Sequence, residues 1–224
     1  MHEERTLTGT DTAATRRGFL TTSAKVLGGG AAALVLAGTP LAGGQSAAAA
    51  PSDIDILNYA LTLEHLEAAF YTEGLQRFSR GDFQSARFLR GFGGRVISTA
   101  YEYFQLIRDH EVTHVKTLIS VIQKLGGTPV GPACYNFGYS TVDQFVKVAE
   151  ALEDTGVMAY DGAIALIQSP DLQTAGATIA TVEARHAAYL RLLNGNVPFP
   201  AAFDTPKTMQ EILAIAGQFI VPCR

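Results

Sequence analysis

The stretch Asp109-His110-Glu111-Val112-Thr113-His114 lies within residues 96–125, a largely apolar segment that contains neither proline nor glycine. This composition predicts one long helix, which ends at Gly126-Gly127. A glutamate and a histidine three residues apart share one face of a helix, about one turn from each other. Glu111 and His114 are therefore placed to bind one metal ion or two neighbouring ions.

The same spacing recurs in Glu183-Ala184-Arg185-His186, within a second apolar helical stretch. Residues 51–224 hold four histidines and nine glutamates, so two such pairs seldom arise by chance. Two Glu-x-x-His pairs on different helices are typical of a four-helix bundle that holds a carboxylate-bridged pair of metal ions in its core. The alternative is that both are ordinary pairs on helix surfaces.

Apolar periodicity, and the breaks between the periodic segments, predict four long helices and a short fifth, over residues 54–78, 96–125, 141–168, 172–193 and 209–219. A mixed segment with a short helix near residues 83–89 joins the first two. The third and fourth are tightly connected, which makes them antiparallel neighbours, whereas the connection 128–140 is long enough to return the chain to the same end. The predicted fold is all-α: a ferritin-like four-helix bundle with one long crossover and a short fifth C-terminal helix.

The first and third helices repeat a second pattern, in which a Leu-Glu pair is followed by a tyrosine seven residues after the glutamate: Glu64 with Tyr71, and Glu153 with Tyr160. The chain thus reads as a duplicated helix pair, and counting residues from the helix ends brings all four carboxylates to one level. We interpret Tyr71 and Tyr160 as hydrogen-bond donors to the ligands, the alternative being plain core tyrosines. The predicted metal ligands are Glu64, Glu111, His114, Glu153, Glu183 and His186.

Neighbouring residues leave alternatives open. Glu67 and Glu150 each lie one turn from a predicted ligand, so each either substitutes as a ligand or lies outside the site. His110 is one turn before His114 and is interpreted as a surface residue or as a support for the ligands. Gly156 and Gly162 are costly inside a helix and indicate close packing or a bulge beside the site.

The residue types suit two divalent cations. Carboxylates bridge hard or borderline cations, and neutral imidazole completes each coordination sphere while open positions remain. Four carboxylates against two divalent ions leave the site neutral, which makes its burial tolerable. Without metal, the like charges would raise some of the carboxyl pKa values.

Residues 1–50 are predicted to be an export signal rather than part of the fold. Thr15-Arg16-Arg17-Gly18-Phe19-Leu20 is a twin-arginine pattern, and an apolar run, residues 26–42, follows it. Small residues with Ala-x-Ala cleavage options precede Pro51. Cleavage would leave residues 51–224 as one domain in the periplasm, in the cell envelope or outside the cell. The alternative is a membrane anchor that is never cleaved.

The remaining residues argue against nucleic acid as a partner. Removing the four basic and three acidic residues of the signal from totals of 17 and 21 leaves 13 basic and 18 acidic residues, with no basic cluster. Cys134 and Cys223 are the only cysteines. In an oxidising compartment an isolated pair predicts a disulfide, although two unrelated thiols are the alternative.

Several motifs together carry a resemblance: residues 63–71, His110-Glu111 with His114-Val115 and Leu118, Gly156-Val157 with Ala159-Tyr160, residues 182–188, and the loop 198–204. With these motifs the chain resembles the ferritin-like superfamily, and more narrowly the exported ferritin-like domain proteins related to desiccation-associated proteins. The resemblance covers most of residues 53–219. It implies a di-iron or di-manganese carboxylate bundle, and it implies much less about activity.

The first functional expectation is an exported ferroxidase that binds two iron ions, with Glu111 and Glu183 as bridges, and consumes O2 or peroxide in oxidative or desiccation stress. One alternative is a manganese catalase-like site that dismutes peroxide. A second is a stress or envelope protein in which two metal ions stabilise the bundle without turnover. The expected partners are metal ions, O2 or peroxide and the twin-arginine export machinery. A homo-oligomer is compatible with the sequence, and the Pro-rich loop disfavours a storage cage.

Overall fold

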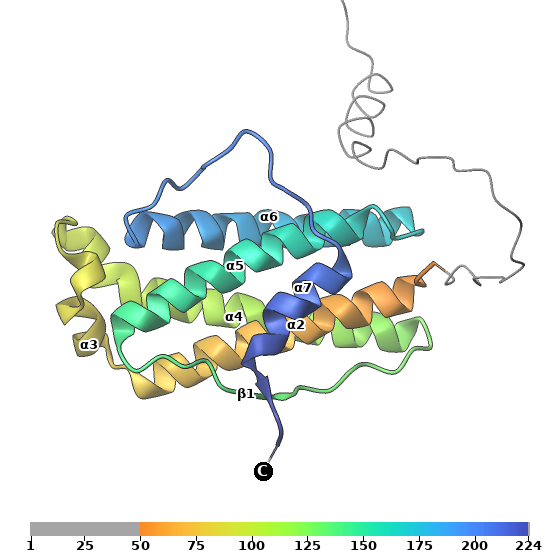
Figure 1. The fold of residues 1–224 in the computed structure, drawn as a ribbon, viewed down its shortest axis with the longest axis horizontal. Helices are drawn as coiled ribbons and strands as arrows, with labels where there is room; N and C mark the ends of the chain where they lie inside the picture. Colours follow the sequence, from red (N-terminus) through yellow and green to blue (C-terminus); the bar gives the residue numbers. More distant parts are fainter. Residues whose placement is uncertain (1–49, 224) are drawn as a thin grey trace, which may run out of the picture. The chain divides into compact units, whose positions relative to one another are not determined.

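A computed structural model describes residues 50–223, so the predicted export signal lies outside the described residues except for Ala50. Four long helices build the domain: α2 (Asp53–Arg77), α4 (Gly94–Lys124), α5 (Val142–Ile164) and α6 (Pro170–Leu193) (Figure 1). The short helices α3 (Arg80–Ser85) and η1 (Arg87–Leu89) join α2 to α4. The predicted all-α class is confirmed.

Three of the four long helices, α2, α5 and α6, begin where a side chain caps the helix, whereas α4 begins after Gly93 without one. Ser52 and Asp55 form a capping box at the start of α2, and Thr141 forms one with Gln144 at the start of α5. Ser169 caps α6, whose first residue is Pro170. These local signals place the helix starts within two residues of the prediction.

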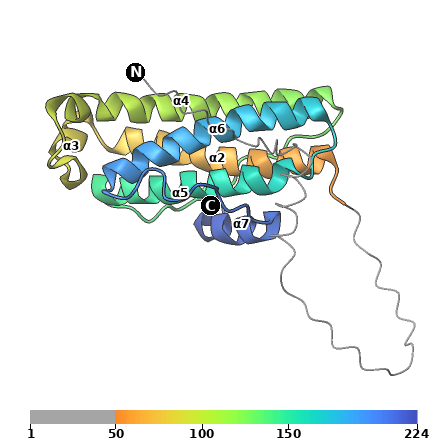
Figure 2. The same ribbon diagram turned by 90° about the horizontal axis from the view of Figure 1, so that it is seen from above.

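The helices pack as two pairs, α2 with α4 and α5 with α6, and α2 also contacts α5. Figure 2 shows α4 and α5 at opposite edges of the bundle, with α7 (Met209–Ala216) packed on the outer side of α5. This pairing agrees with a duplicated helix pair. Within residues 50–223, none of the helices combines the length and the apolar character that a membrane crossing requires.

The crossover from α4 to α5 runs along α2, as Figure 1 shows. The backbone N–H of Val130 donates to Asn58 Oδ1 near the start of α2 (2.7 Å), and Arg77 at its end donates to the carbonyl oxygen of Tyr139 (3.0 Å). The crossover therefore spans the helix, as predicted, and returns the chain to the end of the bundle from which α4 started.

The crossover also contains a structural feature that the sequence analysis missed. Strand β1 (Cys134–Tyr135) pairs antiparallel with β2 (Ile220–Val221), which follows the short 3-10 helix η2 (Gly217–Phe219). The predicted disulfide is present between Cys134 and Cys223. It fastens the crossover to the C-terminal segment across a sequence separation of 89 residues.

The third long helix is shorter than predicted, because α5 ends at Ile164 rather than at residue 168. The backbone N–H groups of Gln168 and Ser169 donate to the carboxylate of Asp53 at the start of α2. Pro170 disfavours helical geometry in the residue before it, so Ser169 lies outside the helix and caps α6 instead. The predicted fifth helix is likewise divided into α7 and η2.

Candidate metal centre

The six predicted ligands come together between two apolar layers. Phe70, Phe104 and Phe145 lie on one side, whereas Leu61 and Leu118 lie on the other. The six form two groups whose candidate ligand atoms lie within 4.8 Å of one another: Glu64, Glu111, His114 and Glu183; and Glu111, Glu153, Glu183 and His186. Each group has its own histidine and its own glutamate, and the groups share Glu111 and Glu183. This is the pattern of two adjacent ions with two bridging carboxylates.

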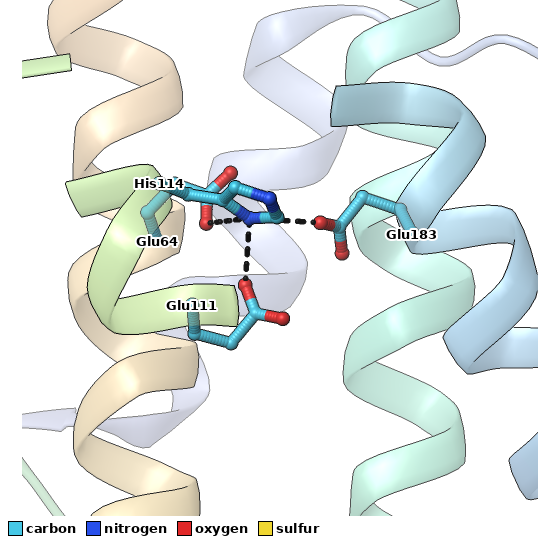
Figure 3. A group of neighbouring side chains, drawn as sticks. All are labelled: Glu64, Glu111, His114 and Glu183. Carbon is cyan, nitrogen blue, oxygen red and sulfur yellow. Dashed lines mark hydrogen bonds and ion pairs between the residues drawn. The ribbon is translucent and has the colours of Figure 1, made fainter. Parts of the chain in front are cut away.

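The first group is drawn in Figure 3. Nδ1 of His114 lies 3.2 Å from Glu64 Oε2, from Glu111 Oε2 and from Glu183 Oε1. Side chains from α2, α4 and α6 thus surround one imidazole nitrogen. In the metal-free centre a protonated His114 supplies positive charge to these three oxygens. A metal ion at the same place would supply it instead.

The second group repeats this arrangement on the other half of the bundle. Nδ1 of His186 lies 3.1 Å from Glu111 Oε1 and from Glu153 Oε2, and 4.0 Å from Glu183 Oε2. The four carboxylates are 0% exposed, and His114 and His186 are 9% and 5% exposed. Such complete burial of four acids requires compensating positive charge or protonation.

Two tyrosines hold the unshared glutamates. Tyr71 of α2 donates to Glu153 Oε1 of α5, and Tyr160 of α5 donates to Glu64 Oε1 of α2, both at 2.5 Å. Each tyrosine therefore binds the glutamate of the opposite half rather than that of its own helix. Such hydrogen bonds orient a ligand carboxylate so that its other oxygen faces the ion.

His110, whose role the sequence left open, contacts the candidate ligand His186. Its Nδ1 lies 2.9 Å from Nε2 of His186, and the two rings stack. His186 therefore uses one ring nitrogen toward the carboxylates and the other toward His110. A partner on the remote nitrogen determines which tautomer a ligand histidine adopts.

The two additional glutamates have different environments. Glu150 accepts hydrogen bonds from the side-chain amides of Asn194 (2.6 Å) and Asn196 (2.8 Å), away from the centre. Glu67 is buried beside the centre. Gly156 leaves room for the carboxyl group of Glu67, whereas Gly162 allows the backbone of Lys207 to approach closely. Both glycines thus mark close packing, as predicted.

Burial and charge together set the pKa values in the metal-free centre. Burial raises the pKa of Glu64 to about 7, against the opposing effect of the hydrogen bond with His114. Burial acts likewise on Glu111, but hydrogen bonds from His114 and His186 outweigh it and lower this pKa to about 2. Burial would lower both imidazole pKa values, yet the carboxylates raise them to about 12 for His114 and about 10 for His186.

The donor set fits a pair of metal ions. Among residues 50–223, both carboxylate oxygens of Glu183 and Oε1 of Glu111 are buried without a well-aligned hydrogen bond, although an imidazole Nδ1 lies 3.2 Å from Glu183 Oε1 and 3.1 Å from Glu111 Oε1. Buried acceptors are rarely left unpaired, and these belong to the two glutamates that both groups share. Four carboxylates and two imidazoles, without a thiolate, suit hard to borderline divalent cations.

The chain is similar to proteins of known sequence and structure. Protein rds1 of Schizosaccharomyces pombe is 27% identical over 178 residues, which are 76% of this chain. The chain spans 40% of the length of that relative. A crystal structure of a conserved hypothetical protein, rv2844, from Mycobacterium tuberculosis matches at a TM-score of 0.47 and 19% identity, over 66% of this chain and 94% of that chain. Residues 52–196 match the family described as the ferritin-like domain, and the chain belongs to this family.

Proposed function

We propose that this protein binds two iron ions between its four long helices and oxidises Fe(II), with O2 or peroxide as the electron acceptor, outside the cytoplasm. The observation that carries the proposal is the pair of buried groups that share Glu111 and Glu183. When bound, the iron pair supplies two electrons, enough to reduce O2 to hydrogen peroxide or hydrogen peroxide to water.

Each ion would have its own glutamate and histidine, and two glutamates would be shared. Glu64 and His114 would hold one ion, Glu153 and His186 the other, and the two shared glutamates would bridge them. Because both histidines carry raised pKa values in the metal-free centre, ion binding must displace their protons. Tyr71 and Tyr160 keep the unshared carboxylates oriented, and the surrounding apolar layers exclude bulk water.

Two observations support action outside the cytoplasm. The twin-arginine pattern at residues 15–20 belongs to a route that exports proteins already folded, which suits a centre loaded before export. The disulfide between Cys134 and Cys223 suits an oxidising compartment. Removal of iron or of oxidants there would protect cells under oxidative or desiccation stress.

The test is metal analysis of the protein isolated after native export, followed by assays of Fe(II) oxidation and of peroxide consumption. We expect about two iron ions per chain and oxidation of Fe(II) faster than in protein-free buffer. Bound manganese with oxygen release from peroxide would favour the catalase-like alternative. Bound metal without turnover of either substrate would favour a purely stabilising role.

A variant tests the ligands independently of turnover. His186→Ala removes one imidazole from the second group, so we expect the metal content to fall by about one ion per chain. Glu150→Gln is the matched control, because Glu150 contacts Asn194 and Asn196 rather than the centre. A metal content that is unchanged in His186→Ala would contradict the ligand assignment.

A further inference from the structure

A fifth acidic side chain lies at the centre but belongs to neither group of candidate ligands. Glu67 is one helical turn after Glu64 on α2, and it is 4% exposed. A Cβ atom placed on Gly156 of α5 would lie 3.2 Å from Glu67 Oε1 and 3.4 Å from Glu183 Oε2. The Glu67 carboxyl group therefore crosses from α2 to the backbone of α5, beside a shared carboxylate.

The duplication of the chain shows that this position is asymmetric. An offset of 89 residues relates Glu64 to Glu153 and Tyr71 to Tyr160, and it relates Glu67 to Gly156. One half therefore carries a carboxyl group where the other half carries no side chain. The missing side chain opens the space that the Glu67 carboxyl group occupies.

The surroundings of Glu67 do not compensate its charge. Burial, and after it the negative charges of Glu183 and Glu153, raise its pKa well above the ordinary value. A carboxyl group in such a place destabilises the metal-free fold unless it is protonated. The carboxyl group reaches Gly156, one turn after Glu153 on α5, and Oε2 of Glu183 beside this position is the oxygen that faces His186.

We propose that Glu67 is a seventh protein ligand, which binds through the space above Gly156 to the ion held by Glu153 and His186. This inference rests on the proposed metal pair. It makes the two ion positions unequal, because the other ion has no counterpart of Glu67. The four carboxylates of the two groups neutralise two divalent ions. Oxidation of one ion to the trivalent state adds one positive charge, and the Glu67 carboxylate neutralises it.

The test uses the full chain and Co(II), which binds without being oxidised by air under mild conditions. Calorimetric titration measures the two affinities, and visible absorption reports coordination number, because Co(II) bands strengthen as ligands are lost. For Glu67→Gln we expect both ions to bind, one of them at least about tenfold more weakly and with stronger absorption. Glu150→Gln, also three residues from a predicted ligand, should match the unaltered protein.

A second variant moves the carboxyl group to the other half. In Glu67→Gly combined with Gly156→Glu, a carboxyl group from α5 takes the space that the Glu67 side chain leaves, so the duplication predicts that the ion beside His114 becomes the tighter one. The inference is overturned if Glu67→Gln retains both affinities and the spectrum while His186→Ala loses an ion, a result that leaves the metal pair standing. Absence of Co(II) binding by the unaltered protein would overturn both proposals together.

Discussion

At the scale of single residues, the crossed hydrogen bonds of Tyr71 and Tyr160 connect the two halves of the centre. Each hydroxyl group binds one oxygen of a glutamate that the opposite half contributes. The duplication alone would allow each tyrosine to serve either half. The structure shows that the halves are linked, so that each of the two proposed ions would depend on a tyrosine from the other half.

Replacement of these tyrosines by phenylalanine should affect different ions. Tyr160→Phe frees Glu64 and should weaken the ion beside His114, whereas Tyr71→Phe frees Glu153 and should weaken the ion beside His186. We expect an affinity loss of about 10- to 100-fold in each case, because such partners orient the ligand. Titration with Co(II) measures the effect when Tyr160→Phe is combined with His186→Ala and Tyr71→Phe with His114→Ala, so that only the ion in question is left.

Tyr59→Phe is the matched control. Tyr59 is also a buried tyrosine of α2, and among residues 50–223 its hydroxyl group has no hydrogen-bond partner. We expect its replacement to leave both affinities unchanged. If Tyr160→Phe weakened only the ion beside His186, the crossed arrangement would be contradicted.

At the scale of elements, α7 and the loop before it depend on a glycine of α5. A Cβ atom on Gly162 would overlap the carbonyl oxygen of Lys207. The backbone N–H of Lys207 donates to the carbonyl oxygen of Met158, so this close approach is part of how the C-terminal segment is attached. The glycine that weakens α5 as a helix thereby allows α7 to pack against it.

Gly162→Ala should lower the free energy of unfolding by about 1 to 3 kcal/mol, because backbone would have to move away from the new methyl group. Gly176→Ala in α6 is the control, since its Cβ would meet Ile164 Cδ1 at an ordinary 3.7 Å. That variant should stabilise the protein by up to about 1 kcal/mol through helix propensity. Urea unfolding measures both, and equal effects would contradict the proposed role of the close approach.

The disulfide makes a separate prediction for the crossover. Replacing Cys134 and Cys223 together by serine should lower the free energy of unfolding by up to about 4 to 5 kcal/mol, because the unfolded chain loses a constraint on a long loop. A reducing agent should lower the stability of the unaltered protein similarly and have no effect on the variant. If a reducing agent did not change the stability of the unaltered protein, this role of the disulfide would be contradicted.

At the scale of the whole molecule, the buried centre makes the stability of the metal-free protein depend on pH. The pKa values of Glu64, His186 and His114 are raised to about 7, about 10 and about 12. Between the ordinary value of Glu, 4.5, and pH 10, the folded state therefore binds more protons than the unfolded state. The lowered pKa of Glu111, about 2, has its effect only below this window.

Because the folded state holds the additional protons, its stability should fall as pH rises from 5 to 8. The contribution of Glu64 alone is on the order of 3 kcal/mol. Urea midpoints of metal-free protein at the two pH values measure the fall. Added metal should reduce or reverse it, because ions replace the protons more readily at high pH. Metal-free protein that became more stable toward pH 8 would contradict the assigned shifts.

The sequence by itself determined the architecture and the level at which the ligands meet. Helical periodicity is local, so the repeated Glu-x-x-His spacing places each pair on one helix face wherever the helix packs. Connection lengths predicted the crossover, and the isolated cysteine pair predicted the disulfide that the structure contains. The two-residue strands were missed because they form only where the crossover meets the C-terminal segment.

Only the tertiary structure decided which neighbouring polar groups face the centre. Glu67 and Glu150 have equivalent local patterns, yet one is buried beside Glu183 and the other binds two asparagines of the segment after α6. Likewise, His110 contacts His186, which is 76 residues away in the sequence. These outcomes depend on how the helices are rotated against one another, and that rotation is set by packing over the whole bundle rather than by any local run of residues.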